Sequence, residues 1–172
     1  MSSPMPPQLQ EFERAVGGAI AVAVSTVAER CFFACVDQCD DPQPDEIESE
    51  WLVATVHFHD GPVHGSLACA LPADLALRLY DAFTGRDPVT PLPRRDQVED
   101  LAGEFSNMVC GTWLTRVDTH RVFRLSAPSV TRVDRPADEG RHREWVAVNN
   151  RPVAIDWDVA HAPEYPAVQA GR

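Results

Sequence analysis

The sequence contains no lysine, so all 15 basic residues are arginine, and 26 acidic residues outnumber them. Without lysine, the chain cannot use Schiff-base chemistry, a phosphate-binding P-loop lysine or the lysine of a protein kinase. The formal net charge of −11 repels the phosphates of nucleic acids and of anionic lipid headgroups. We therefore expect neither nucleic acid nor a membrane surface as a partner.

Long hydrophobic runs and a cysteine framework are also missing. The longest uncharged apolar run spans residues 15–28, which is shorter than a membrane-spanning helix of about 20 residues. A secretion signal carries basic residues before such a run, but Glu11 and Glu13 precede the single Arg14 here. The 5 cysteines form no recognisable disulfide pattern, which suits a reducing compartment. These absences predict a cytoplasmic protein.

The length of 172 residues, with a mass of 19.0 kDa, corresponds to one domain with its own hydrophobic core. Residues 1–8 carry three prolines and no apolar periodicity, and residues 161–172 are similar. We therefore expect a disordered N-terminus over 1–8, a single domain over 9–160 and a flexible C-terminal tail over 161–172.

Apolar residues recur every three or four positions over 9–31, which predicts a long amphipathic helix. Gly17 and Gly18 lie inside this helix, so we expect a kink or a close helix contact there. An acidic, proline-containing stretch over 40–50 breaks the pattern and is expected to be a loop.

The period of the apolar residues changes to two over 51–59 and 63–71, which predicts two strands joined by a turn at 60–62. Pro72 is compatible with the first turn of a second helix, and Gly85 is a good C-terminal cap for it. This part of the chain therefore reads as a hairpin followed by a helix.

A third helix is predicted over 97–116, with Asp96 and Glu99 as its capping box. Strand-like stretches follow at 120–134, 144–148 and 152–157, and Asn149-Asn150 is a good hairpin turn between the last two. This order predicts an α+β fold in which long helices pack on one face of a largely antiparallel sheet.

The third helix separates apolar from polar residues at about 100° per residue. Its predicted core face consists of Val98, Leu101, Ala102, Phe105, Met108, Val109 and Thr112. Nearly opposite, Asp100, Glu104, Asn107 and Gly111 fall within an arc of roughly 60°. The outward face thus presents a carboxylate and a carboxamide one turn apart.

Gly103 and Gly111 flank this polar pair. A glycine inside a helix costs about 0.5 to 1 kcal/mol relative to alanine, which favours the close approach of a partner to this face. The alternative is that Glu104 and Asn107 are ordinary solvated residues and that Gly103 packs against another helix of the domain. The residues alone leave both explanations open.

The segment DLAGEFSNMVCG resembles the signature helix of the CheC/CheX/FliY family of chemotaxis phosphatases. In that signature, an acidic or Ser residue is followed by Glu four positions later and by Asn three after that. Here these are Asp100, Glu104 and Asn107. The preceding LACALPADLALRLYDAFTG also resembles the strand and helix that come before the signature. A single signature helix is typical of the CheX-like branch.

This resemblance implies a phosphatase that accelerates hydrolysis of the phospho-aspartate of a CheY-like response-regulator receiver domain. Asn107 would orient the in-line water, and Glu104 would dock to the receiver lysine. Asp100, Gly103 and Gly111 would contact the same partner. The chain itself would bind no cofactor, because the receiver contributes the Mg²⁺.

The resemblance also implies a homodimer, and Trp145 and Trp157 in the C-terminal strands could cover a sheet edge in it. Other functional classes stay open. The chain could be a catalytically silent CheX-like binding or assembly module in two-component or chemotaxis signalling, or a small-molecule-sensing domain with a fortuitous motif. Neither the receiver nor the pathway follows from the sequence.

Two further groups of residues could hold a metal ion. Cys31, Cys35 and Cys39 share one helical face in the predicted arrangement. Three histidines lie near the first hairpin: His57, His59 and His64. Neither group has the spacing typical of metal-binding pairs, and cysteine also serves as a small core residue. We therefore expect no metal site.

Overall fold

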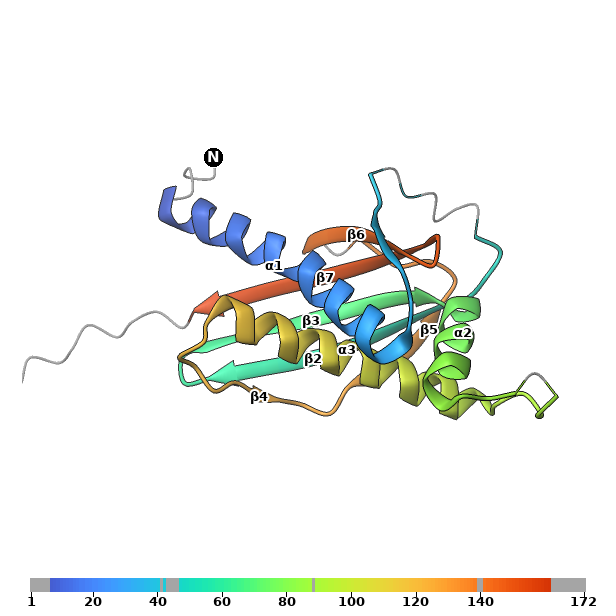
Figure 1. Ribbon diagram of the computed structural model, residues 1–172. Coiled ribbons are helices and arrows are strands. Elements are labelled where there is room, and N and C mark those ends of the chain that lie inside the picture. Colours follow the sequence, from blue (N-terminus) through green and yellow to red (C-terminus); the bar gives the residue numbers. More distant parts are fainter. Residues whose placement is uncertain (1–6, 41, 43–46, 88, 139–140, 162–172) are drawn as a thin grey trace, which may run out of the picture.

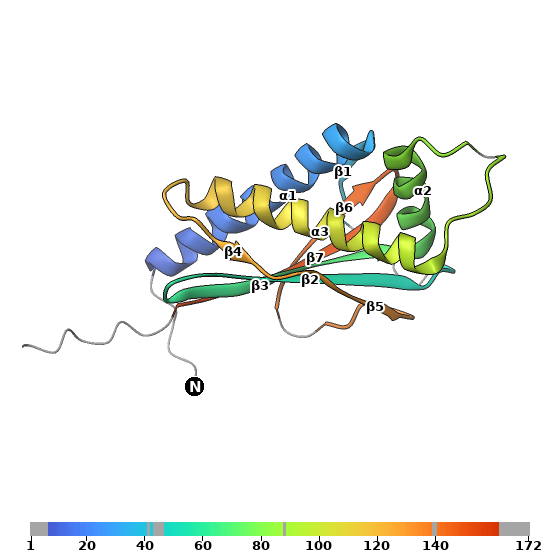
Figure 2. The ribbon, with the colours of Figure 1, turned by 90° about the horizontal axis from the view of Figure 1, so that it is seen from below.

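The computed structural model describes residues 7–40, 42, 47–87, 89–138 and 141–161. Within these residues the helices are α1 (Pro7–Phe32), α2 (Ala73–Thr84) and α3 (Arg95–Val117). The strands are β1 (Val36–Gln38), β2 (Trp51–Asp60), β3 (Val63–Pro72), β4 (Arg124–Leu125), β5 (Ser129–Val133), β6 (His142–Val148) and β7 (Arg151–His161). The helices cover one face of the sheet (Figures 1 and 2), which confirms the predicted α+β arrangement.

The strands form one antiparallel sheet in the order β1-β6-β7-β3-β2-β4, and β5 also pairs with β2. The β2–β3 hairpin turns at Gly61, whose φ of 56° suits glycine. The β6–β7 hairpin turns at Asn149 and Asn150, with φ of 48° and 60°. Asparagine tolerates this left-handed conformation better than most residues do. Both predicted hairpins are therefore confirmed.

β7 lies inside the sheet, between β6 and β3. Its Trp157 is buried, with 4% of its surface exposed, and packs near Trp113 of α3 at a ring-centroid distance of 5.9 Å. Trp145 of β6 packs edge-on against Trp51 at 6.3 Å. The expectation that Trp157 covers a sheet edge is wrong, because β7 has a strand on each side.

Three segments that the sequence predicts to be loose fall wholly or partly outside the described residues: 1–6, 43–46 within the acidic loop, and 162–172. α1 begins at Pro7, so residues 7 and 8 are helical rather than part of the disordered N-terminus. β7 includes His161, which the sequence assigned to the flexible tail.

Gly17 makes a close contact with a strand rather than with a helix. A Cβ atom at Gly17 would lie 3.1 Å from Oε1 of Glu144 in β6, whereas a Cβ at Gly18 would meet nothing within 4 Å. The glycine therefore provides room for the Glu144 side chain beneath α1. The close contact expected in this part of α1 exists, but its partner is a carboxylate of the sheet.

α1 ends at Phe32, and Phe33 turns the chain with a φ of 53°. Cys35 and Cys39 consequently lie beyond the helix, so the prediction that they share a helical face with Cys31 is wrong. The sequence also failed to predict β1, which has 3 residues and pairs with β6. A strand this short carries too little apolar alternation to be recognised.

α2 ends at Gly85, whose φ of 65° is the predicted left-handed cap. At the start of α3, the backbone N–H of Arg94 donates to Oε1 of Gln97 at 2.9 Å. The predicted capping box of Asp96 and Glu99 is therefore wrong. Asp96 lies inside the helix and pairs with Arg94 at 3.0 Å, and this pairing lowers the pKa of Asp96.

Only parts of the predicted strand stretch 120–134 are strands, namely β4 and β5. The chain between α3 and β4 is a loop fixed by polar contacts. Asp118 accepts a hydrogen bond from the backbone N–H of His120 at 2.9 Å and one from the guanidinium of Arg121 at 3.1 Å. Arg121 also pairs with Asp60 at the end of β2, at 3.4 Å.

Candidate functional site

α3 is held on the sheet by a buried face that is broader than predicted. The predicted core residues Val98, Leu101, Ala102, Phe105 and Val109 are buried, and Met108 and Thr112 are half-buried. Ser106 is also fully buried, and its hydroxyl donates to the carbonyl of Ala54 in β2 at 2.8 Å. Trp113 Nε1 donates to the carbonyl of Val16 in α1 at 3.1 Å. These bonds fix the rotation of α3 about its axis.

The face left to solvent is the polar stripe that the sequence predicts. Asp100 and Glu104 are exposed, and Asn107 and Gly111 are half-buried. The spacing of Glu104 and Asn107 separates them by about 4.5 Å along the helix axis. Their side chains can therefore reach one bound group together.

Glu104 and Asn107 are both free to bind a partner. Within the part of the chain that the structure describes, neither side chain makes a hydrogen bond or an ion pair. A carboxylate offers only acceptors, whereas a carboxamide offers both a donor and an acceptor. The stripe can thus attract a cation at Glu104 and hold a water molecule at Asn107.

The two glycines of α3 have different surroundings. Gly103 is buried, and a Cβ there would lie 3.0 Å from Cγ of Pro128. This internal contact with the segment before β5 gives Gly103 a packing role. A Cβ at Gly111 would meet only Cδ1 of Leu125, at 3.8 Å, and Gly111 borders a pocket of about 220 Å³.

A half-buried ion-pair network anchors the N-terminal half of α3. Glu99 accepts from Arg132 of β5 at 2.6 Å and from Arg95 at 3.3 Å, and Arg132 also binds Glu50 at 3.0 Å. The hydrogen bond from Arg132 lowers the pKa of Glu99 most strongly. No local sequence pattern predicts this network, because Arg132 lies far from both Glu99 and Glu50 along the chain. Glu99 is thus neutralised by arginines, whereas Glu104 is not.

The other candidate residues do not assemble into a site. His57 and His59 are exposed on the strand face opposite to buried Phe58. In the ranges that the structure describes, no three His, Cys, Asp or Glu side chains are grouped to hold a metal ion. Burial raises the pKa of the Cys69 and Cys110 thiols to about 12, which makes them poor nucleophiles.

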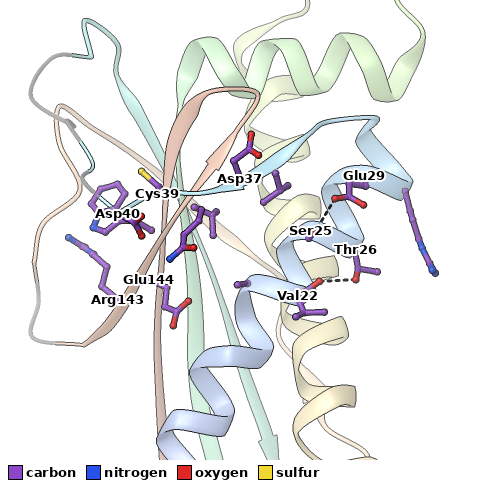
Figure 3. Close-up of a pocket in the computed structure, with 15 residues that line it drawn as sticks. Val22, Ser25, Thr26, Glu29, Asp37, Cys39, Asp40, Arg143 and Glu144 are labelled. Atoms are coloured by element: carbon purple, nitrogen blue, oxygen red, sulfur yellow. Dashed lines mark hydrogen bonds between the residues drawn. The ribbon is translucent and has the colours of Figure 1, made fainter.

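A separate pocket of about 690 Å³ lies between α1, β1 and β6 (Figure 3). In Figure 3, Glu144 of β6 points toward α1 across this pocket. Burial raises the pKa of the Glu144 carboxyl, and no described side chain pairs with it. The lining residues include none from α3, so this pocket is distinct from the polar stripe.

The sequence matches the model of the family described as chemotaxis phosphatase CheX over residues 52–143, which is more than half of the chain. This match contains β2 from its second residue, β3, α2 and α3, together with the whole polar stripe. A search of curated proteins finds no match.

Solved structures share the fold at low sequence identity. CheX from Vibrio vulnificus superposes with a TM-score of 0.63 at 15% identity, covering 84% of this chain and 96% of its own. A complex of CheX with CheY, BeF3 and Mg²⁺ from Borrelia burgdorferi superposes with a TM-score of 0.58 at 12% identity, covering 85% of this chain and 98% of the matched chain. FliY from Thermotoga maritima superposes with a TM-score of 0.57 at 13% identity, covering 93% of each chain.

Proposed function

Because the chain belongs to the CheX family of chemotaxis phosphatases, we propose that it accelerates hydrolysis of the phospho-aspartate of a CheY-like receiver domain. The observation that carries this proposal is the unpaired Glu104 and Asn107 on the outward stripe of α3. Glu99 of the same helix, by contrast, is paired with Arg132 and Arg95. The solved complex of a structurally similar CheX with CheY supports a receiver as the partner.

Asn107 is the proposed catalytic residue. In the reaction, the oxygen of a water molecule attacks phosphorus, and the bond between phosphorus and the aspartate oxygen breaks. The products are a free aspartate carboxylate and inorganic phosphate, so the leaving group needs no proton. A carboxamide is not a base, but it can donate to and accept from one water and hold it in line with the breaking bond.

Glu104 is the proposed docking residue. Receiver domains keep a lysine beside the phosphoryl group, and a glutamate one turn from Asn107 can form a charge-assisted contact with that lysine. Such a contact would place Asn107 behind the phosphorus atom. Asp100 lies one turn further toward the start of α3 and would contact the edge of the same partner.

The proposed chemistry needs no cofactor in this chain. The receiver contributes the Mg²⁺ that neutralises the phosphoryl oxygens, and the presence of Mg²⁺ in the solved CheX–CheY complex is consistent with this role. Such a partner would place the chain in the cytoplasm. Gly111 supports the proposal because the space beside it can accept a side chain of the receiver.

The deciding experiment follows the decay of a phosphorylated receiver domain with Mg²⁺ and substoichiometric amounts of this protein. We expect faster decay that continues over many turnovers. Acceleration that stops after one equivalent, or tight binding without any acceleration, would instead identify a catalytically silent binding module.

A further inference from the structure

A small pocket adjoins the C-terminal end of the polar stripe. It has a volume of about 220 Å³, and its lining includes Gly111 and Thr115 of α3 together with Val122 and Leu125 from the chain that follows the helix. Gly111 belongs to both the stripe and the pocket, and it lies about 6 Å from Asn107 along the helix axis. A protein that docks on Asn107 would therefore reach this pocket as well.

The buried part of the pocket lining is apolar. Leu114 is buried, and Phe123 and Leu125 are half-buried, whereas Thr115 and Val122 are exposed. The pocket is smaller than typical small-molecule sites, which enclose roughly 300 to 1,000 Å³. Its size and lining therefore suit one apolar side chain of a larger partner.

Val122 is presented to solvent by a backbone that is anchored on both sides. Its side chain is 83% exposed. The preceding residue, Arg121, pairs with Asp60 at the end of β2 at 3.4 Å. The following residue, Phe123, packs edge-on against Phe58 of β2, with the ring centroids 5.6 Å apart. An apolar side chain on such an anchored backbone loses little conformational freedom when a partner covers it.

We infer that Val122 and the pocket beside Gly111 form an apolar docking subsite for the receiver domain. This inference rests on the proposed function. Glu104 and Asn107 would supply the polar contacts that orient the receiver, and the subsite would add affinity by burying apolar surface next to them. The feature that fits it is an apolar side chain beside the receiver's phosphorylated aspartate. A receiver with a charged side chain at that position would be disfavoured.

The test compares Val122→Ser and Val122→Ile with the wild type in binding a CheY-like receiver that carries beryllofluoride and Mg²⁺. Val122→Ser removes the apolar contact, so affinity should fall about fivefold or more, whereas Val122→Ile keeps that contact and should retain the wild-type affinity. Because residue 122 lies on the surface, the melting temperature of both variants should stay within about 2 °C of the wild type.

Val89→Ser is the matched control. Val89 is 88% exposed and lies in the loop before α3, whereas Val122 lies in the loop after it. α3 has 23 residues and is therefore about 34 Å long. Figure 1 shows the two loops at opposite ends of this helix. We expect Val89→Ser to bind the receiver like the wild type, and an equal loss of affinity in Val89→Ser and Val122→Ser would overturn the inference.

Combining Val122→Ser with Gly111→Leu tests whether both positions belong to one subsite. Gly111→Leu fills the pocket and should already exclude the receiver's apolar side chain. Adding Val122→Ser should then weaken binding by less than about twofold more, because residues that share a partner contact are not additive. Losses that multiply in full would show that the two positions do not form one subsite.

The remaining outcomes separate the subsite from the proposed function. Unchanged receiver affinity in Val122→Ser, with Asn107→Ala still impaired in phospho-receiver decay, would refute the subsite and leave the proposed function intact. A melting temperature of Val122→Ser lowered by more than about 2 °C would show that the valine packs internally, which would also overturn the inference. Failure of the wild type to bind any receiver would refute the proposed function and the subsite together.

Discussion

Asn107 and Glu104 lie one turn apart on α3, but only Glu104 carries a charge. Their separate contributions can therefore be measured. Both side chains point away from the core, so replacing either should change the free energy of unfolding by no more than about 0.5 kcal/mol. Effects on activity would then report on the site rather than on folding.

Asn107→Ala removes the group that orients water. We expect the rate of phospho-receiver decay to fall by about 10²-fold or more, because a misplaced reacting group typically costs a rate factor of this size. Receiver binding should be retained. Decay measured at saturating protein, beside a binding titration with the beryllofluoride form, separates the two quantities. A wild-type rate of phospho-receiver decay in Asn107→Ala would contradict the proposed phosphatase activity.

Glu104→Ala removes a charge-assisted contact worth about 1.5 to 3 kcal/mol, which corresponds to a loss of affinity of about 10- to 150-fold. Glu104→Gln keeps the shape of the side chain and serves as the control for charge. We expect Glu104→Gln to lose most of the receiver affinity that Glu104→Ala loses. In both variants, receiver binding should depend less on salt concentration than it does in the wild type. Equal affinity of Glu104→Gln and the wild type would show that no lysine faces this position.

At the scale of the element, α3 contains two glycines whose substitution should act in opposite ways. Gly111 faces a pocket of about 220 Å³, so Gly111→Leu should fill that space, weaken receiver binding and leave the melting temperature unchanged or higher. Thermal melts and binding titrations on the same preparation test this. Intact binding in Gly111→Leu would place the receiver elsewhere.

Gly103→Leu should instead lower stability. Its Cβ would already lie 3.0 Å from Pro128, so a larger side chain must push the segment before β5 away from α3. Overpacking of this kind costs about 1 to 3 kcal/mol, and each kcal/mol lowers the melting temperature by about 2 to 4 °C in a chain of this size. A variant as stable as the wild type would show that this segment yields easily.

Local pattern was enough to predict the elements that carry the polar stripe. The apolar positions of α3 fix its rotation, so Asp100, Glu104 and Asn107 could be placed on its outer side before any tertiary contact was known. The cap at Gly85 was predictable for the same reason. The end of α1 was not, because Phe33 occupies the left-handed position where a glycine would mark the end of a helix.

The features that sequence analysis missed depend on contacts between distant residues. β1 exists because it pairs with β6, more than a hundred positions later. Arg132 joins Glu99, 33 positions away, to Glu50, 82 positions away. No sequence pattern near Gly103 indicates its contact with Pro128, and this contact is what gives the glycine its internal packing role.

At the scale of the whole molecule, two glutamates should give opposite dependences of stability on pH. Burial raises the pKa of Glu144 above its ordinary value of 4.5, so the ionised form destabilises the folded protein at neutral pH. Glu144→Gln should therefore raise the melting temperature at pH 7 to 8, and this gain should vanish below about pH 4.5, where Glu144 is protonated in both states. Thermal melts across this pH range measure the difference.

Glu99→Gln is the matched control with the opposite sign. Its arginine partners lower the pKa of Glu99 below 4.5, so its ionised form stabilises the folded protein above that pH. Glu99→Gln should lower the melting temperature at neutral pH, and the deficit should shrink as the pH falls through the folded pKa. The same sign of change in both variants would contradict these assignments.

The homodimer remains a prediction for the whole molecule. The outer edge of β6 is covered by β1 only at Val146–Val148, which leaves the rest of that edge without a strand among the described residues. Light scattering at micromolar concentration should give twice 19.0 kDa if two copies associate. A particle of 19.0 kDa would contradict the dimer.

The place of β7 in the sheet determines when a newly made chain can fold. β7 is the last described element, yet it pairs with β3 from Val63 to Ala70 and with β6 along the whole of that strand. Until the ribosome has released residues 151–161, β3 has an open edge and α1 and α3 lack part of the surface on which they pack. The emerging chain therefore exposes apolar strand edges that chaperones bind, and the polar stripe of α3 acquires its final orientation only after its last strand has been synthesised.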